Sequence, residues 1–91
     1  MSNELIVVWD LPDDPQGNVQ HIAQHGLTVD DVEDVLYSRD SVTSFSRSSG
    51  QPITFGYTTG GEHIAVVWEL VAADPRTIYP ITAYAVPEAR D

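Results

Sequence analysis

Cysteine is absent from this sequence of 91 residues. Its absence excludes a disulfide-stabilised scaffold, a zinc site built on thiolates and a cysteine nucleophile. A chain of this length buries somewhat more than about 60% of its unfolded surface, which is enough for one modest hydrophobic core without such staples. We therefore expect a single domain over residues 1–91.

Lysine is absent as well. The four basic residues are all arginine, against fourteen aspartates and glutamates, and the formal net charge is −10. Because proteins bind nucleic acid mainly by neutralising phosphates with Lys and Arg, this charge disfavours ordinary RNA or DNA binding. It also disfavours anionic membrane surfaces. A basic protein partner fits the charge, and so does a role of the acids in solubility alone.

Long apolar runs and targeting signals are also missing. The first four residues carry one acid, Glu4, and no Lys or Arg, where a signal peptide is basic, and the run Leu5–Trp9 is too short for the apolar part of such a signal. No stretch approaches the roughly 18 apolar residues of a membrane helix. With the lack of cysteine, these features predict a cytoplasmic protein that does not use a membrane, and they leave its oligomeric state open.

Apolar periodicity and turn residues predict seven elements in the order β-α-α-β-β-β-β. One short helix is expected over Asn18–His25, ended by Gly26, and a second over residues 29–37. The expected strands are Leu5–Trp9, Val42–Ser46, Ile53–Thr58, His63–Val71 and Thr77–Val86. The order predicts an α+β domain, with two short helices packed on one face of a small, mainly antiparallel sheet.

Three finer expectations follow from single positions. Thr28 and Asp31 have the spacing of a capping box, which marks the start of the second helix. The strand over His63–Val71 is the most apolar, so it should lie at the centre of the sheet. Pro80 cannot donate a backbone hydrogen bond, so the last strand should lie on an edge or carry a bulge.

Several short motifs together suggest a family. They are the pair Trp9-Asp10, the helix end His25-Gly26, the capped acidic helix, the strand pair Phe55-Gly56 and the segment Tyr79–Tyr84. From about residue 6 to 88 this layout resembles the BrnT-like toxins, small ribonucleases of bacterial type II toxin–antitoxin systems with a RelE/ParE-like fold. The resemblance implies an endoribonuclease scaffold and an antitoxin-like protein partner encoded beside it.

The chain departs from that family where cations are common. Gln24 precedes His-Gly, where Lys is usual; Gln51-Pro52 lies where Arg is usual; and Tyr84 follows Thr-Ala, where Arg is usual. Such cations would anchor phosphate and stabilise the transition state of cleavage. The resemblance therefore implies a ribonuclease whose activity is lost or altered.

The remaining reactive side chains give a candidate site. The candidate catalytic residues are His21, Arg47, Glu69 and Tyr84, and the candidate binding residues are His25, Tyr57 and His63. A histidine and Glu69 would act as acid and base, and Arg47 would hold phosphate. The tyrosines could stack on bases. Each residue also has an ordinary structural explanation, such as a helix cap, a solvated strand carboxylate or a polar turn.

No cofactor motif is present, and the i, i+4 pair of His21 and His25 alone is too weak a pattern to predict a metal. Two hypotheses remain. The first is an atypical or inactive endoribonuclease of the toxin type. The second is a non-catalytic immunity or adaptor protein that recognises a basic partner through the acidic helix face around Asp30–Asp34.

Overall fold

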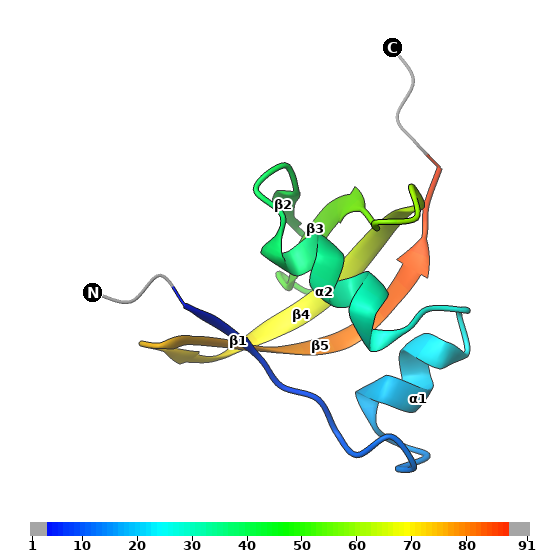
Figure 1. Ribbon diagram of the computed structural model, residues 1–91. Helices are drawn as coiled ribbons and strands as arrows, with labels where there is room; N and C mark the ends of the chain where they lie inside the picture. The colour runs from blue at the N-terminus through cyan, green and yellow to red at the C-terminus, as the bar shows by residue number, and fades with distance from the viewer. Residues whose placement is uncertain (1–3, 88–91) are drawn as a thin grey trace.

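A five-stranded sheet with both helices packed against it forms the molecule (Figure 1). The computed structural model describes residues 4–87. Its strands are β1 (Leu5–Val7), β2 (Val42–Phe45), β3 (Pro52–Tyr57), β4 (His63–Ala73) and β5 (Arg76–Ala85). Its helices are α1 (Asn18–Ala23) and α2 (Val29–Tyr37). The predicted α+β fold and the predicted order of elements are confirmed.

The strand order is β1-β5-β4-β3-β2, so the apolar strand β4 lies at the centre, as its composition predicted. β1 is parallel to β5, and the other neighbours are antiparallel. Alternation along β4 sends Ile64, Val66 and Trp68 into the core under the helices. The residues between them point to the opposite side of the sheet, which we call the open face.

The start of α2 follows from its sequence. The Thr28 hydroxyl accepts a hydrogen bond from the backbone N–H of Asp31, and the Asp31 carboxylate accepts one from the N–H of Thr28. This capping box satisfies two backbone donors at the helix end. Val32 and Val35 are fully buried on the inner side of α2, which leaves its acidic side outward.

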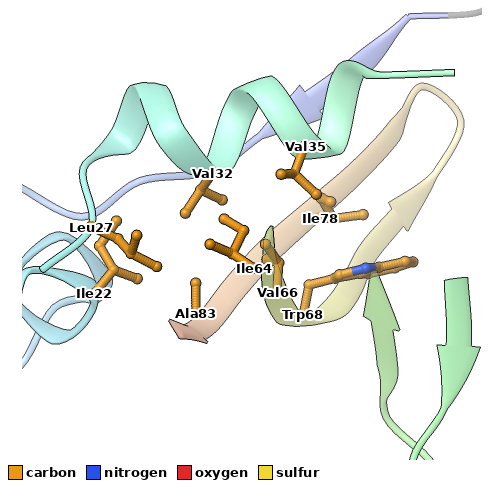
Figure 2. Packing of buried hydrophobic residues seen from close by; sticks show 9 residues of the cluster. All are labelled: Ile22, Leu27, Val32, Val35, Ile64, Val66, Trp68, Ile78 and Ala83. Atoms are coloured by element: carbon orange, nitrogen blue, oxygen red, sulfur yellow. The ribbon is translucent and has the colours of Figure 1, made fainter. Parts of the chain in front are cut away.

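The core lies between the helices and the inner face of the sheet (Figure 2). It consists of buried side chains from both helices, from the loop that joins them and from β4 and β5. They are Ile22, Leu27, Val32, Val35, Ile64, Val66, Trp68, Ile78 and Ala83. Burying each of the larger ones contributes about 1.5–3 kcal/mol of transfer free energy, so this small cluster accounts for much of the driving force for folding.

The prediction for Pro80, an edge position or a bulge, is confirmed by a bulge, since the register between β4 and β5 shifts at Val67/Trp68. As a whole, β5 lies between β1 and β4. β5 tolerates proline there because β1 ends beside Ile78, before Pro80 is reached. The first helix is also shorter than predicted and ends at Ala23, although Gly26 has the expected positive φ of 78°.

Neither helix in the described part of the chain is long and apolar enough to cross a bilayer.

Candidate functional site

The predicted site residues His21, His25 and Tyr84 lie together beside β5. The His21 and His25 rings are stacked with centroids 6.1 Å apart, since a spacing of four places both on one side of α1 and its following turn. The His25 ring is 6.3 Å from that of Tyr84. Tyr84 follows the buried Ala83 on β5, so its side chain points to the open face.

A second predicted pair lies on the same face. The His63 and Tyr57 rings are 4.8 Å apart, because the two residues are directly paired between β3 and β4. Tyr84 is paired with Ala65, two residues along β4 from His63, so His63 and Tyr84 are diagonal neighbours. His21 of α1 and His25 of the turn after it thus adjoin Tyr84, which lies on the open face with His63 and Tyr57. We call these five residues the aromatic row.

Arg47 and Glu69 lie apart from the aromatic row. Arg47 is in the turn after β2, at the opposite end of β3 from Tyr57, and the five residue steps between Pro52 and Tyr57 span about 17 Å. Glu69 is on the open face, as predicted from the inward position of Trp68, but it is paired with Tyr79. It lies four residues, or about 13 Å, along β4 from Ala65.

The chemistry that the aromatic row can perform follows from this arrangement. Imidazoles can move protons and phenols can stack on rings, but the row contains neither a cation to hold a phosphate nor a carboxylate. Two polar atoms on the open face, His63 Nδ1 and Thr82 Oγ1, are buried and have no hydrogen-bond partner among the described residues. The predicted catalytic set is therefore divided among three places in the fold.

The acidic side of α2 borders a cleft of about 570 Å³ that we call the acidic cleft. Its lining residues are Asp30, Glu33, Asp34, Tyr37, Ser38 and Thr59. Three of the six are acidic and none is basic. The helical spacing of the acids and the turn after β3 that carries Thr59 create this concentration of negative charge.

Neutral donors hold two of these carboxylates in place. Asp34 accepts hydrogen bonds from the backbone N–H of Thr59 at 3.0 Å and from its hydroxyl at 2.7 Å. These two bonds, the backbone one first, lower the pKa of Asp34 below its usual value. Glu33 accepts a bond of 2.9 Å from the indole N–H of Trp9. Hydrogen bonds from neutral groups therefore fix the orientation of both carboxylates without neutralising their negative charge.

Tyr37 stands at the same cleft and is 53% exposed. Its hydroxyl donates to the backbone carbonyl of Leu5 at 3.1 Å. Burial raises the pKa of Tyr37, and the charges of Glu33 and Glu4 add to that effect. The ring thus stays neutral beside the acids and offers an aromatic surface to a cation.

Sequence reasoning missed a polar network at the end of β1. Asp10 accepts hydrogen bonds from the Tyr79 hydroxyl and from the backbone N–H of Asn18. The Asn18 side-chain amide in turn donates to the carbonyls of Val8 and Pro80 at 3.0 Å each. The only sequence signal of this network was that Trp9-Asp10 and Tyr79-Pro80 both appear among the motifs that suggested a family. Those motifs did not indicate that the two segments are in contact.

Within residues 4–87, no group of three or more His, Cys, Asp or Glu side chains is placed to hold a metal ion. Comparison of the chain with protein families, with curated proteins and with solved structures gives no match.

Proposed function

We propose that this protein is a non-catalytic binding module on a toxin-like scaffold, and that its acidic cleft binds a basic segment of a partner protein. The observation that carries the proposal is the composition of the cleft, with Asp30, Glu33 and Asp34 on one wall and no cation among the lining residues that the structure describes. The partner would present arginine or lysine to these acids. An antitoxin-like protein encoded beside this one and acting in the cytoplasm would fit.

Electrostatics supports this assignment over a role of the acids in solubility alone. Acids that only keep a protein soluble need no fixed orientation. Here Asp34 is held by Thr59 and Glu33 by Trp9, so the carboxylates keep their places before a partner arrives. Preorganised charge of this kind reduces the entropy lost on binding and speeds encounter with a basic surface.

The positions of the predicted catalytic residues support binding over cleavage. A ribonuclease needs a general base and a phosphate-binding cation around one reacting bond. Arg47 lies at the far end of β3 from Tyr57 and His63, and the positions of Gln24 and Tyr84 supply no cation. A net charge of −10 also repels RNA.

Fluorescence anisotropy with a short arginine-rich peptide tests the proposal. We expect saturable binding that weakens as salt rises from about 0.05 to about 0.5 M, because salt screens exposed charge pairs. The double substitution Asp30→Asn/Glu33→Gln should weaken binding about fivefold to tenfold. The matched control Asp13→Asn/Glu69→Gln removes the same charge outside the cleft and should change affinity far less. If both double substitutions weaken binding equally, the peptide responds to the overall negative charge of the protein and not to the acidic cleft.

An atypical endoribonuclease is the second candidate, and the stacked rings of His21 and His25 beside Tyr84 favour it. Its test is expression in bacteria, together with cleavage of a labelled RNA by the purified protein. If the row is catalytic, expression arrests growth, and His21→Ala relieves the arrest. Arg47→Ala would have the same effect if the arginine holds phosphate. Normal growth with intact RNA would leave the binding module as the function.

A further inference from the structure

A second pocket, of about 230 Å³, lies on the inner side of the sheet where α2 no longer covers it. All five strands contribute to its wall, so the sheet curls around it. Its strand residues are Leu5 of β1, Thr43 of β2, Thr54 of β3, Trp68 of β4, and Arg76 and Ile78 of β5. None of its lining residues within 4–87 is acidic, in contrast to the acidic cleft on the other side of Ser38.

Arg76 is the one charged residue in the described lining of this pocket. Its guanidinium carbon lies 5.5 Å from the centre of the Trp68 ring, a cation–π arrangement that fixes the charge over an aromatic face. Among residues 4–87 no carboxylate forms an ion pair with it. In a chain with fourteen acids, an arginine that faces a pocket without an acidic partner can pair with an anion from outside.

Hydroxyl groups add a directed donor. The Trp68 indole N–H donates to Thr54 Oγ1 at 2.8 Å, and Thr54 Oγ1 is 2.8 Å from Thr43 Oγ1. Thr54 has a single hydroxyl proton, which Thr43 can accept. That arrangement leaves the Thr43 proton to donate into the pocket, on the same wall as Trp68.

The rest of the described lining is aliphatic apart from Ser38 and Ser41. Leu5, Leu36 and Ile78 provide the aliphatic surface of the pocket. A pocket of 230 Å³ holds a molecule of about eight heavy atoms, if each takes roughly the 30 Å³ share of a water. A complementary ligand has one anionic, hydrogen-bond-accepting end and a short apolar body.

We propose that this pocket binds a small monocarboxylate with an apolar body, such as a short-chain fatty acid. The carboxylate pairs with Arg76 and accepts a hydrogen bond from Thr43, while the hydrocarbon displaces water from Leu5, Leu36 and Ile78. This site is independent of the acidic cleft, and neither proposal requires the other.

Titration with hexanoate, followed by two-dimensional NMR of the ¹⁵N-labelled protein, tests this proposal. The Trp68 indole N–H should shift, together with the backbone amides of Leu5 and Thr43, with a dissociation constant on the order of 1 mM. The neutral analogue hexanol should bind about tenfold more weakly, because it cannot pair with the guanidinium. Inorganic phosphate, which has no apolar body, should produce no shift at Trp68.

Substitutions of arginine complete the test. Arg76→Gln should weaken hexanoate binding about tenfold and leave hexanol binding unchanged. Arg76→Lys, which keeps the charge but not the planar stacking on Trp68, should retain part of the preference for hexanoate. The matched control Arg47→Gln removes the same charge at a distance and should bind like the original protein. Hexanoate and hexanol binding equally well, or no shift at Trp68, would overturn the proposal.

Discussion

The hydroxyl of Tyr79 donates a hydrogen bond of 2.5 Å to the carboxylate of Asp10, which lies 69 residues earlier in the chain. Asp10 also accepts a bond from the N–H of Asn18, the first residue of α1. One carboxylate thus joins the segment after β1, the start of α1 and the strand β5. The hydrogen bond from Tyr79, followed by that from Asn18, lowers the pKa of Asp10.

Removal of the Tyr79 hydroxyl should destabilise the fold. We expect Tyr79→Phe to lower the midpoint of urea unfolding without a change in its slope, because the charged acceptor loses a donor while the buried surface is kept. Tyr84→Phe is the matched control, since no hydrogen bond of the Tyr84 hydroxyl is found in the described residues. Equal midpoints for the two variants would mean that the Asp10 bond contributes nothing.

The same hydrogen bond should appear in an alkaline titration. Hydrogen bonding to Asp10 is the main cause that raises the pKa of Tyr79 to about 12, from 10.0. Because the folded pKa is the higher one, the resulting stability is fully present below pH 10 and is lost as pH rises through 12. Absorbance titration of tyrosinate should show a group that ionises near pH 12 in the folded protein, and Tyr79→Phe should lack it.

Acid should weaken the loop that closes the acidic cleft. The bonds from Thr59 lower the pKa of Asp34 from 3.8, so the stability they provide is present above pH 3.8 and is lost as pH falls through the lower, folded pKa. Hydrogen exchange of the Thr59 amide should therefore speed up in that acidic range. In Asp34→Asn, which keeps an acceptor without the charge, this pH dependence should disappear; its persistence would assign the effect to another acid.

Gly56 of β3 should not tolerate a side chain. A Cβ at this position would overlap Ser41 Oγ and lie 3.1 Å from Val35 Cγ1, where α2 packs on the sheet. Gly56→Ala should cost about 1–3 kcal/mol of unfolding free energy, as overpacking does. At Gly60 the nearest atom would be 3.7 Å away, so Gly60→Ala should change stability by less than about 0.5 kcal/mol. Similar losses at both glycines would contradict the close packing.

Ser41, the residue that a side chain at Gly56 would overlap, allows a second test of this close packing. Ser41 Oγ donates to the carbonyl of Val35 at 2.7 Å, so Ser41→Ala alone should cost about 1 kcal/mol. Combined with Gly56→Ala it should cost less than the sum of the two, because it removes the overlapping atom. A double-mutant cycle measures this coupling, and strict additivity would place the strain elsewhere.

Local chemistry made much of the fold predictable. Thr28 and Asp31 are three residues apart and fixed the start of α2, because a capping box depends only on neighbours in the chain. Pro80 predicted a bulge for a similar reason, because proline has no backbone N–H to donate at any position in a sheet. The pairing of β1 with β5 was not predictable in this way, because no local pattern says which strand a short edge strand joins.

The candidate site was predictable only in part. His21 and His25 came together because their spacing matches a helix turn, and Tyr57 met His63 across a hairpin. Arg47 lies away from these residues, and this could not be predicted, because the sequence of a turn does not indicate where the turn lies relative to the rest of the sheet. The pocket around Arg76 needed all five strands to be in place.

The most direct test of the central claim is an NMR titration of the labelled protein with the arginine-rich peptide. We predict that the largest amide shifts fall on the lining of the acidic cleft, at Asp30, Glu33, Asp34 and Thr59. They should diminish in Asp30→Asn/Glu33→Gln. Shifts confined to the aromatic row around His25 and Tyr84, or shifts spread evenly over the acidic surface and unchanged in that variant, would contradict the account.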